Sequence, residues 1–167
     1  MADIRVKRRE DFGNQMLQRI AALESKFDIR VGLLHRILLA ETGTVEQILS
    51  ILTNGTIRVE VIEQKEVARI ITRESLIMNK VGKVLIRANS TISKNNLPPN
   101  VLTQIKHKEF GIGTIIADSG LETFRRIVEV GYDPVNKSVF RKYQIIVKKK
   151  VAFEIKEELV GIEESRY

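Results

Sequence analysis

The chain has 167 residues, of which 43% are hydrophobic, and its formal net charge is +7. This length predicts one domain with a real core, and the ordinary hydrophobic share argues against a disordered protein. Cysteine is absent, which excludes disulfides and thiolate chemistry, and neither a membrane-spanning run nor a secretory signal is recognisable, so a cytoplasmic protein is expected.

The positive charge includes two separate runs, residues 7–9 and 148–150, and the second run is followed by an acidic tail. Tryptophan is absent and aromatic residues make up only 5% of the chain, whereas single-strand nucleic-acid binders need aromatic side chains on which bases stack. We therefore interpret both runs as solvated surface, with the steering of small anions as the alternative. Neither a nucleic-acid nor a membrane partner is expected.

The first third of the chain has the periodicity of helices. From residue 10 to 27 the apolar positions fall on one helical face: Met16, Leu17, Ile20, Leu23 and Phe27. A second apolar stretch follows. Thr44 and Gln47 then fit a capping box and Gly55 fits a helix stop, which predicts a helix over 45–53.

The pattern changes next to the alternation of strands. The predicted strands cover residues 57–61, 66–78, 84–92, 126–132, 141–148 and 151–159. Two short helices are expected between the third and fourth strands, the second of them after a glycine turn at 110–113. Because the strands follow one another without a strand–helix rhythm, the expected fold is α+β: a single domain over 1–167, with a central antiparallel sheet and helices packed on one side.

Arg73 is the strongest candidate for binding an anion. In the predicted strand 66–78 it alternates with apolar side chains, and a buried arginine without a partner is very costly. The partner is either a ligand carboxylate or a structural carboxylate of the chain. The remaining alternative is that this face of the strand is exposed.

Glu157 is the corresponding candidate in the last strand. It shares a face with Phe153, Ile155 and Leu159, whereas Glu158 shares its face with charged side chains. A carboxylate on an apolar face suits a general acid or base. The alternative is a strand end at which the face has reached solvent.

Other chemistry finds little support in the sequence. Two histidines, His35 and His107, are too few and too far apart for a metal site, and none of the common nucleotide-binding, zinc-protease or nucleophile motifs occurs. The turn Gly111-Ile112-Gly113 can bring backbone N–H groups close to an anion. An ordinary tight turn gives the same pattern.

The order of these pieces is more specific than any one of them. They are a leucine-rich helix, an acidic turn and a second helix at 35–49, an Arg-Glu strand at 71–78, the Gly-Ile-Gly turn at 111–113, a Glu-Val-Gly strand at 126–131, an Arg-x-Tyr strand at 141–143 and a closing Ile-x-Glu-x-Leu pattern at 155–159. In this order they resemble the chorismate pyruvate-lyase family over residues 30–160.

The resemblance implies helical flaps over an internal ligand cavity, and a carbon–oxygen lyase that converts chorismate to 4-hydroxybenzoate and pyruvate without metal or organic cofactor. Carried over by position, Arg73 binds the ring carboxylate with the backbone N–H of Ile112 beside Gly111, and Glu157 faces the hydroxyl end as base or orienting acceptor. Arg73 and Glu157 are thus the expected catalytic residues. Gly43, in the flap, is expected to contact the substrate.

Two positions depart from the family pattern. Gly43 replaces a bulkier apolar residue, and the loop before Gly111 lacks the family's proline, which bears on lid packing and substrate identity. The alternative function is non-catalytic binding of a small aromatic carboxylate, as in effector domains of this fold in some transcription regulators. A DNA-binding regulator is not expected, since the roughly 30 preceding residues fit one helix rather than a winged helix-turn-helix. A structural interaction protein leaves the inward Arg73 and Glu157 unexplained.

Overall fold

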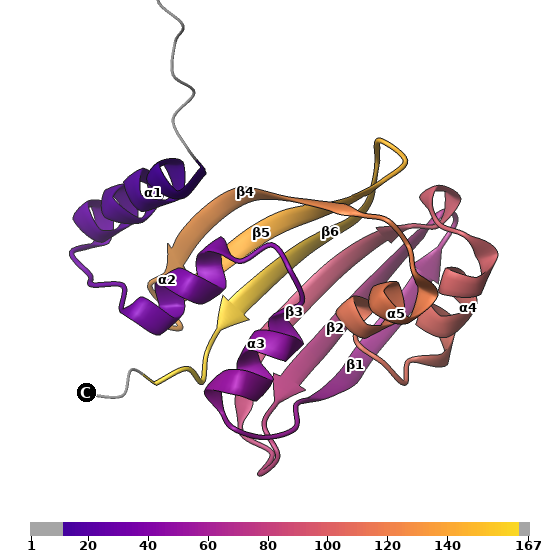
Figure 1. The fold of residues 1–167 in the computed structure, drawn as a ribbon, viewed down its shortest axis with the longest axis horizontal. Helices are drawn as coiled ribbons and strands as arrows, with labels where there is room; N and C mark the ends of the chain where they lie inside the picture. Colours follow the sequence, from indigo (N-terminus) through magenta and orange to yellow (C-terminus); the bar gives the residue numbers. More distant parts are fainter. Residues whose placement is uncertain (1–11, 164–167) are drawn as a thin grey trace, which may run out of the picture.

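The structure is a computed structural model and describes residues 12–163. Six strands form one antiparallel sheet in the order β1-β2-β3-β6-β5-β4 (Figure 1). The strands are β1 (Arg58–Val67), β2 (Ile70–Met78), β3 (Val84–Ser93), β4 (Phe124–Asp133), β5 (Ser138–Val147) and β6 (Lys150–Leu159). The helices are α1 (Phe12–Phe27), α2 (Leu33–Ala40), α3 (Val45–Leu52), α4 (Pro99–His107) and α5 (Ile112–Ser119), with a 3-10 turn, η1 (Lys94–Asn96).

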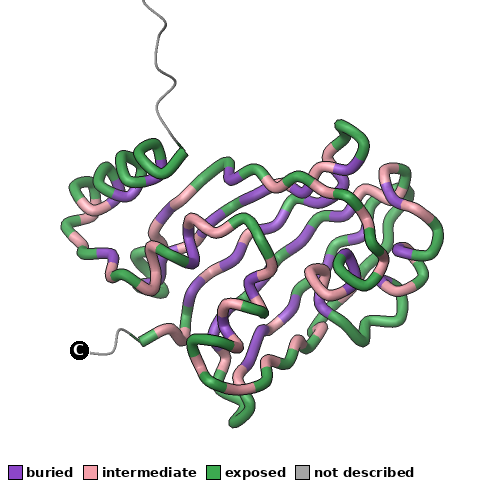
Figure 2. Tube along the Cα trace, viewed as in Figure 1, coloured by how far each residue is buried: buried purple, intermediate pink, exposed green. Residues whose placement is uncertain are grey.

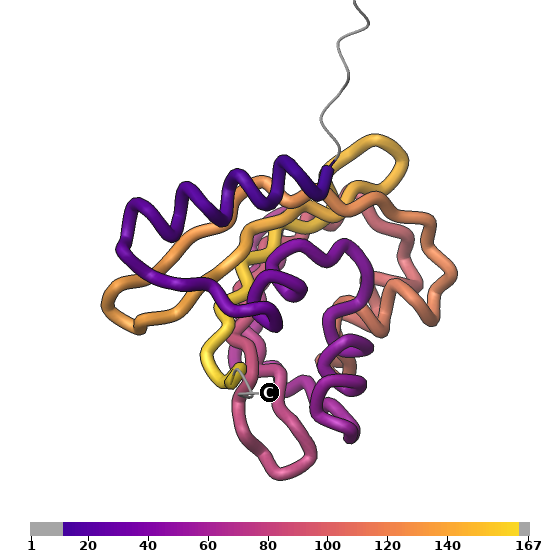
Figure 3. The backbone as a smooth tube through the Cα atoms, turned by 60° about the vertical axis from the view of Figure 1, so that its left-hand side comes forward, coloured from indigo at the N-terminus to yellow at the C-terminus, as the bar shows by residue number. Residues whose placement is uncertain are grey.

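Helices α2, α3 and α5 lie over one face of this sheet (Figures 1 and 3). Along β2 and β5 buried residues alternate with partly or fully exposed ones, because successive side chains of a strand point to opposite faces (Figure 2). The buried face packs against the apolar sides of the helices, including Leu49 of α3, Ile105 of α4 and Ile115 of α5. The opposite face carries mostly polar side chains, among them Glu74, Asn89 and Lys142. The expected α+β fold is confirmed.

The connection from β3 to β4 runs through α4 and α5 and carries the chain to the far edge of the sheet. There α1 packs beside β4: Arg19 Nη1 donates to the carbonyl of Ile127 at 3.3 Å, and the rings of Phe27 and Tyr132 are 5.4 Å apart. Leu17, predicted on the buried face of α1, is instead 52% exposed. No helix within residues 12–163 has the length and apolar character needed to cross a membrane.

The predicted single strand over 66–78 is wrong. The chain turns at Ala68 and Arg69, so residues 66 and 67 belong to β1 and pair with the start of β2. This turn has no glycine, asparagine or proline, and Ala68 takes the left-handed conformation at φ 50°. Arg73 still lies on the buried face, because the error ends before that position.

The ends of α3 also differ from the prediction. Thr44 is the N-cap residue, but its side chain makes no capping hydrogen bond, so the predicted capping box is absent. At the other end Asn54, not Gly55, has a positive φ, of 46°. The N–H of Gly55 donates to the carbonyl of Ser50 at 3.1 Å and closes the last turn.

The structure describes only one of the two basic runs. Residues 148–150 are exposed at the β5–β6 turn, which confirms the interpretation as solvated surface. Residues 7–9, like the first two positions of the predicted helix 10–27, lie outside the described residues.

The turn at Ala68 gives a test of this hairpin. Replacing Ala68 with glycine should stabilise the protein by about 0.5–1 kcal/mol, because a Cβ atom disfavours the left-handed conformation. The matched control is Ala21→Gly on the exposed side of α1, which should destabilise it by about 1 kcal/mol. The free energy of unfolding of both variants can be measured in urea. If Ala68→Gly destabilises the protein as much as Ala21→Gly does, the left-handed conformation at Ala68 is wrong.

Candidate functional site

A cavity of about 40 Å³ lies between the sheet and helices α3 and α5. Its floor is made by the small side chains of Ser75, Ala88 and Ser90. Ser75 pairs with Ala88, and Ser90 pairs with Arg73, so these small residues lie together on β2 and β3. The hollow exists because small residues interrupt a face that is otherwise filled by large apolar side chains.

Glu157 reaches this cavity from β6. Its neighbours in register are Ala88 of β3 and Arg141 of β5, and it is only 3% exposed. Glu158 points to the other face, where it accepts hydrogen bonds from Asn136 and Ser138. Glu157 is therefore the inward carboxylate of this strand.

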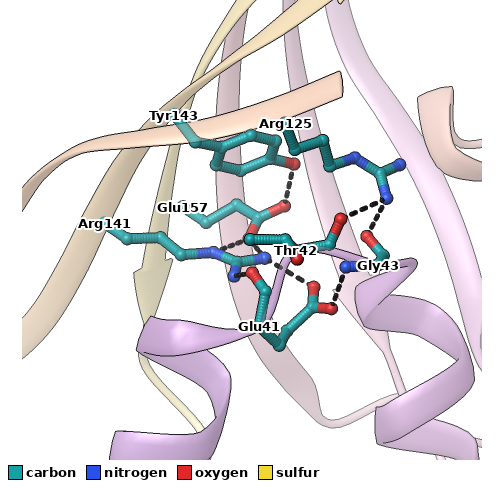
Figure 4. A network of polar contacts seen from close by, with 7 residues as sticks. All are labelled: Glu41, Thr42, Gly43, Arg125, Arg141, Tyr143 and Glu157. Atoms are coloured by element: carbon teal, nitrogen blue, oxygen red, sulfur yellow. Dashed lines mark hydrogen bonds and ion pairs between the residues drawn. The ribbon is translucent and has the colours of Figure 1, made fainter. Parts of the chain in front are cut away.

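Both oxygens of Glu157 are held by neighbours on β5 (Figure 4). Arg141 Nε donates to Oε2 at 2.8 Å, and the hydroxyl of Tyr143 donates to Oε1 at 2.8 Å. Burial and the adjacent charge of Glu157 raise the pKa of Tyr143 well above its ordinary value of 10.0. The phenol therefore stays protonated and acts as a donor.

Arg141 also binds the segment that joins α2 to α3, residues 41–44, which we call the flap turn. Its Nη1 donates to the carbonyl of Glu41 at 2.5 Å, and its Nη2 donates to Glu41 Oε1 at 2.9 Å. Burial alone lowers the pKa of Arg141, but the carboxylate of Glu157 and that of Glu41 overcome this effect and raise it. Arg141 thus stays charged and ties the sheet to the flap turn.

The flap turn has a second arginine contact. Arg125, on β4, donates from Nη1 to the carbonyl of Thr42 at 3.2 Å and to the carbonyl of Gly43. Glu41 completes the turn by accepting from the N–H of Gly43 at 2.6 Å. Three successive carbonyls of the flap turn are therefore fixed by guanidinium groups on two neighbouring strands (Figure 4).

Glu46, at the start of α3, lies against the glycine turn that precedes α5. A Cβ atom on Gly111 would come within 2.5 Å of Glu46 Oε1, and one on Gly113 within 2.8 Å of Oε2, so a side chain at either position would displace the Glu46 carboxylate. Burial raises the pKa of Glu46 above its ordinary value of 4.5; the charge of Glu157 adds to the rise and that of Arg125 opposes it.

Arg73 contacts the residue that precedes the glycine turn at 111–113. It is 2% exposed and donates to Gln64 Oε1 at 2.8 Å, to the carbonyl of Ile105 at 2.6 Å and to the carbonyl of Phe110 at 3.1 Å. No carboxylate among residues 12–163 lies within ion-pair distance of it, and burial lowers its pKa to about 10. Arg73 is a buried cation whose partners are all neutral.

Of the residues predicted from the sequence, Gly43, Gly111, Ile112 and Glu157 line the same cavity. Arg73 does not line it but contacts Phe110, the residue before Gly111. Sequence reasoning missed five charged or polar residues of the site: Glu41, Glu46, Arg125, Arg141 and Tyr143. Arg141 and Tyr143 could have been found by aligning the β5–β6 hairpin, which places Arg141 opposite Glu157. No three His, Asp or Glu side chains in the described part of the chain are arranged to hold a metal ion.

The ion pairs of Arg141 give a prediction of stability. Arg141→Gln leaves Glu157 and Glu41 buried without their cation, which should cost about 3–5 kcal/mol in free energy of unfolding. The control is Lys142→Gln, next in sequence, whose 2.7 Å pair with Glu129 is half exposed and should contribute about 0–1 kcal/mol. If urea unfolding shows the same small loss of free energy of unfolding for Arg141→Gln and Lys142→Gln, the buried ion pairs of Arg141 do not stabilise the fold.

Glu46 gives a prediction of pH dependence. Its raised pKa means that the folded state keeps a proton that the unfolded state loses above the ordinary value of 4.5. Ionisation therefore opposes folding as the pH rises. Glu46→Gln should have a higher Tm than the parent at about pH 7.5, and the difference should vanish below about pH 4. The exposed variant Glu60→Gln serves as control, and a Glu46→Gln protein less stable than the parent at neutral pH would contradict the prediction.

Two proteins are similar in sequence to this chain. A protein of Methanocaldococcus jannaschii, provisionally named a lyase, is 35% identical over 138 residues, which are 73% of this chain and 75% of that protein. The chorismate pyruvate-lyase of Mycobacterium leprae is 29% identical over 139 residues, 66% of each protein and thus just under two thirds of either.

No family model matches the chain. Among solved structures, the ligand-binding domain of a protein provisionally assigned to the GntR family of transcriptional regulators, from Bordetella bronchiseptica, has a TM-score of 0.41 at 8% identity, covering 66% of this chain and 92% of that one. The sequence relatives, together with the order of motifs along the sheet, show that the chain belongs to the chorismate pyruvate-lyase (chorismate lyase-like) family.

Proposed function

We propose that this chain eliminates pyruvate from chorismate and leaves 4-hydroxybenzoate. Two observations support the proposal: Glu157 is a buried carboxylate that lines the cavity, and Arg73, which bonds to the residue before Gly111, is a buried cation with no carboxylate partner among the described residues. A buried guanidinium without an anion is costly, and a ligand carboxylate would supply the missing partner.

The reaction needs few groups because aromatisation drives it. The ring carbon that bears the hydroxyl loses its proton, the electrons of that C–H bond complete the aromatic ring, and the ether bond to the enolpyruvyl group breaks. The departing enolate takes up a proton at carbon and becomes pyruvate. The protein has to orient the ring, exclude water and hold the hydroxyl end during this change.

The site residues take their roles by position. Arg73 binds the ring carboxylate with the N–H donors that do not bond to Gln64, Ile105 and Phe110, and the backbone N–H of Ile112 shares that carboxylate. The first N–H groups of α5 have no partner inside the helix, so they suit an anion. Gly111 lets the ligand approach the backbone, and Gly43 bounds the cavity from the flap turn.

Glu157 acts at the hydroxyl end as an orienting acceptor. Both of its oxygens already accept bonds from Arg141 or Tyr143, which fixes the direction in which a further lone pair can meet a hydroxyl. The role of general base is the alternative for the same carboxylate. No metal or organic cofactor enters this proposal.

Access to the site requires the flap turn or α5 to move. Cavities that enclose small ligands are typically about 300–1,000 Å³, whereas this one has about 40 Å³. Closing again over a bound ligand would expel water and strengthen the electrostatic contacts inside.

The direct test is incubation of the purified protein with chorismate while 4-hydroxybenzoate is followed by ultraviolet absorbance. Arg73→Lys keeps the charge but loses the planar fork, and Glu157→Gln removes the acceptor charge; each should lower kcat/KM at least about 100-fold. Glu158→Gln, on the opposite face of the same strand, is the control and should keep the parent activity.

Circular dichroism melts would verify that the variants are folded. A parent protein that binds 4-hydroxybenzoate but releases no aromatic product from chorismate would reject the lyase. That result would identify the chain as a non-catalytic binder of small aromatic carboxylates, the alternative function for this fold.

A further inference from the structure

Arg125 differs from Arg141 although both bind the flap turn. Arg141 has two carboxylates within 2.9 Å, whereas no carboxylate of residues 12–163 lies within ion-pair distance of Arg125. Its Nη1 donates to the carbonyls of Thr42 and Gly43, but its Nε is buried and has no hydrogen-bond partner. Buried donors in native proteins are nearly always hydrogen-bonded, so we expect Arg125 Nε to bind an acceptor that the described residues do not supply.

Arg125 is placed to meet a ligand. It lies in register with Ile145 on the buried face of β4 and lines the same cavity as Glu46, Tyr143 and Glu157. Its side chain lies beside Tyr143 and next to Thr42 and Gly43 of the flap turn in Figure 4. A ligand that reaches Glu157 would therefore also come near the Arg125 guanidinium.

The cavity region thus has two guanidinium groups without carboxylate partners, Arg73 and Arg125. They come from β2 and β4, four strand spacings apart in the order β2-β3-β6-β5-β4, or about 19 Å between backbones. At this spacing the two guanidinium groups are suited to two separate carboxylates of one ligand.

We propose that Arg125 binds a second carboxylate, linked to the aromatic or pre-aromatic ring through an ether oxygen, and so makes the site selective for dicarboxylates. The inference rests on the proposed function, because chorismate carries its second carboxylate on the enolpyruvyl ether. Elimination separates the two carboxylates: the ring product keeps the contact with Arg73 and loses the contact with Arg125. Bond cleavage thereby weakens the hold on the aromatic product.

Three groups of the cavity bear on an anion at this position. Glu46 opposes it by repulsion, but burial already favours its protonated form, so it can take up a proton as the anion binds. Glu157 is neutralised by Arg141, and Tyr143 is a neutral donor. Because Arg125 also binds Thr42 and Gly43, a carboxylate bound to it would lie next to the flap turn.

The test uses two unreactive probes that differ by one carboxylate: 3-(carboxymethoxy)-4-hydroxybenzoate and 4-hydroxy-3-methoxybenzoate. Calorimetric titration of the full chain should show tighter binding of the diacid. Arg125→Gln should weaken the binding of the diacid by about 10-fold to 100-fold and that of the monoacid by less than about threefold. Only the diacid loses a charge-assisted hydrogen bond in this variant. Arg125→Lys should restore part of the diacid preference. Arg126→Gln is the matched control, because Arg126 is exposed and bonds to Gln144.

Equal weakening of both probes by Arg125→Gln would overturn the inference and leave Arg125 as a support of the flap turn. Failure of the parent to prefer the diacid, or to bind it at all, would also overturn it. The chorismate assay separates this outcome from that of the lyase. If the protein prefers the diacid through Arg125 but does not turn chorismate over, the role of Arg125 is supported and the lyase is rejected. If chorismate is turned over and Arg125→Gln leaves KM and kcat unchanged, the lyase is supported and the role of Arg125 is rejected.

Discussion

The ion pairs of Arg141 are the interaction on which the rest of the site depends. This one guanidinium orients Glu157 on the neighbouring strand and binds both the carboxylate and the carbonyl of Glu41 in the flap turn. Charges this deeply buried are tolerated only when they are paired and hydrogen-bonded, so Arg141, Glu157 and Glu41 stabilise one another as a unit. The unit fixes a carboxylate at the cavity and holds the flap closed by the same set of bonds.

This coupling has a consequence for access to the cavity. The flap turn can leave the sheet only if Glu41 leaves Arg141 and the carbonyls of Thr42 and Gly43 leave Arg125. Opening therefore uncovers two guanidinium groups at once, and an anionic ligand can replace the contacts that they lose. On the other side, Arg73 anchors the carbonyls of Ile105 and Phe110 and so fixes the glycine turn before α5. Arg125 thus lines the cavity itself, whereas Arg141 and Arg73 hold the flap turn and the glycine turn that enclose it.

Strand periodicity predicted Arg73 and Glu157 correctly as inward residues, because a charged side chain among alternating apolar ones has only one face on which to lie. The β1–β2 hairpin could not be predicted, since the turn at Ala68 and Arg69 has none of the residues that favour turns. Glu41 and Arg141 are 100 residues apart, and no local pattern relates them before the sheet and the flap are assembled. The importance of Glu46 depends on how α3 meets the turn at Gly111 and Gly113, which is likewise a tertiary feature.

We expect an aromatic carboxylate to bind between the Arg73 end of the cavity and Glu157. The most direct measurement is a crystal structure of the protein with 4-hydroxybenzoate. The carboxylate should lie within hydrogen-bond distance of the Arg73 guanidinium and the N–H of Ile112, and the hydroxyl should lie within hydrogen-bond distance of Glu157. A ligand bound in the reverse direction, or on the uncovered face of the sheet, would contradict it.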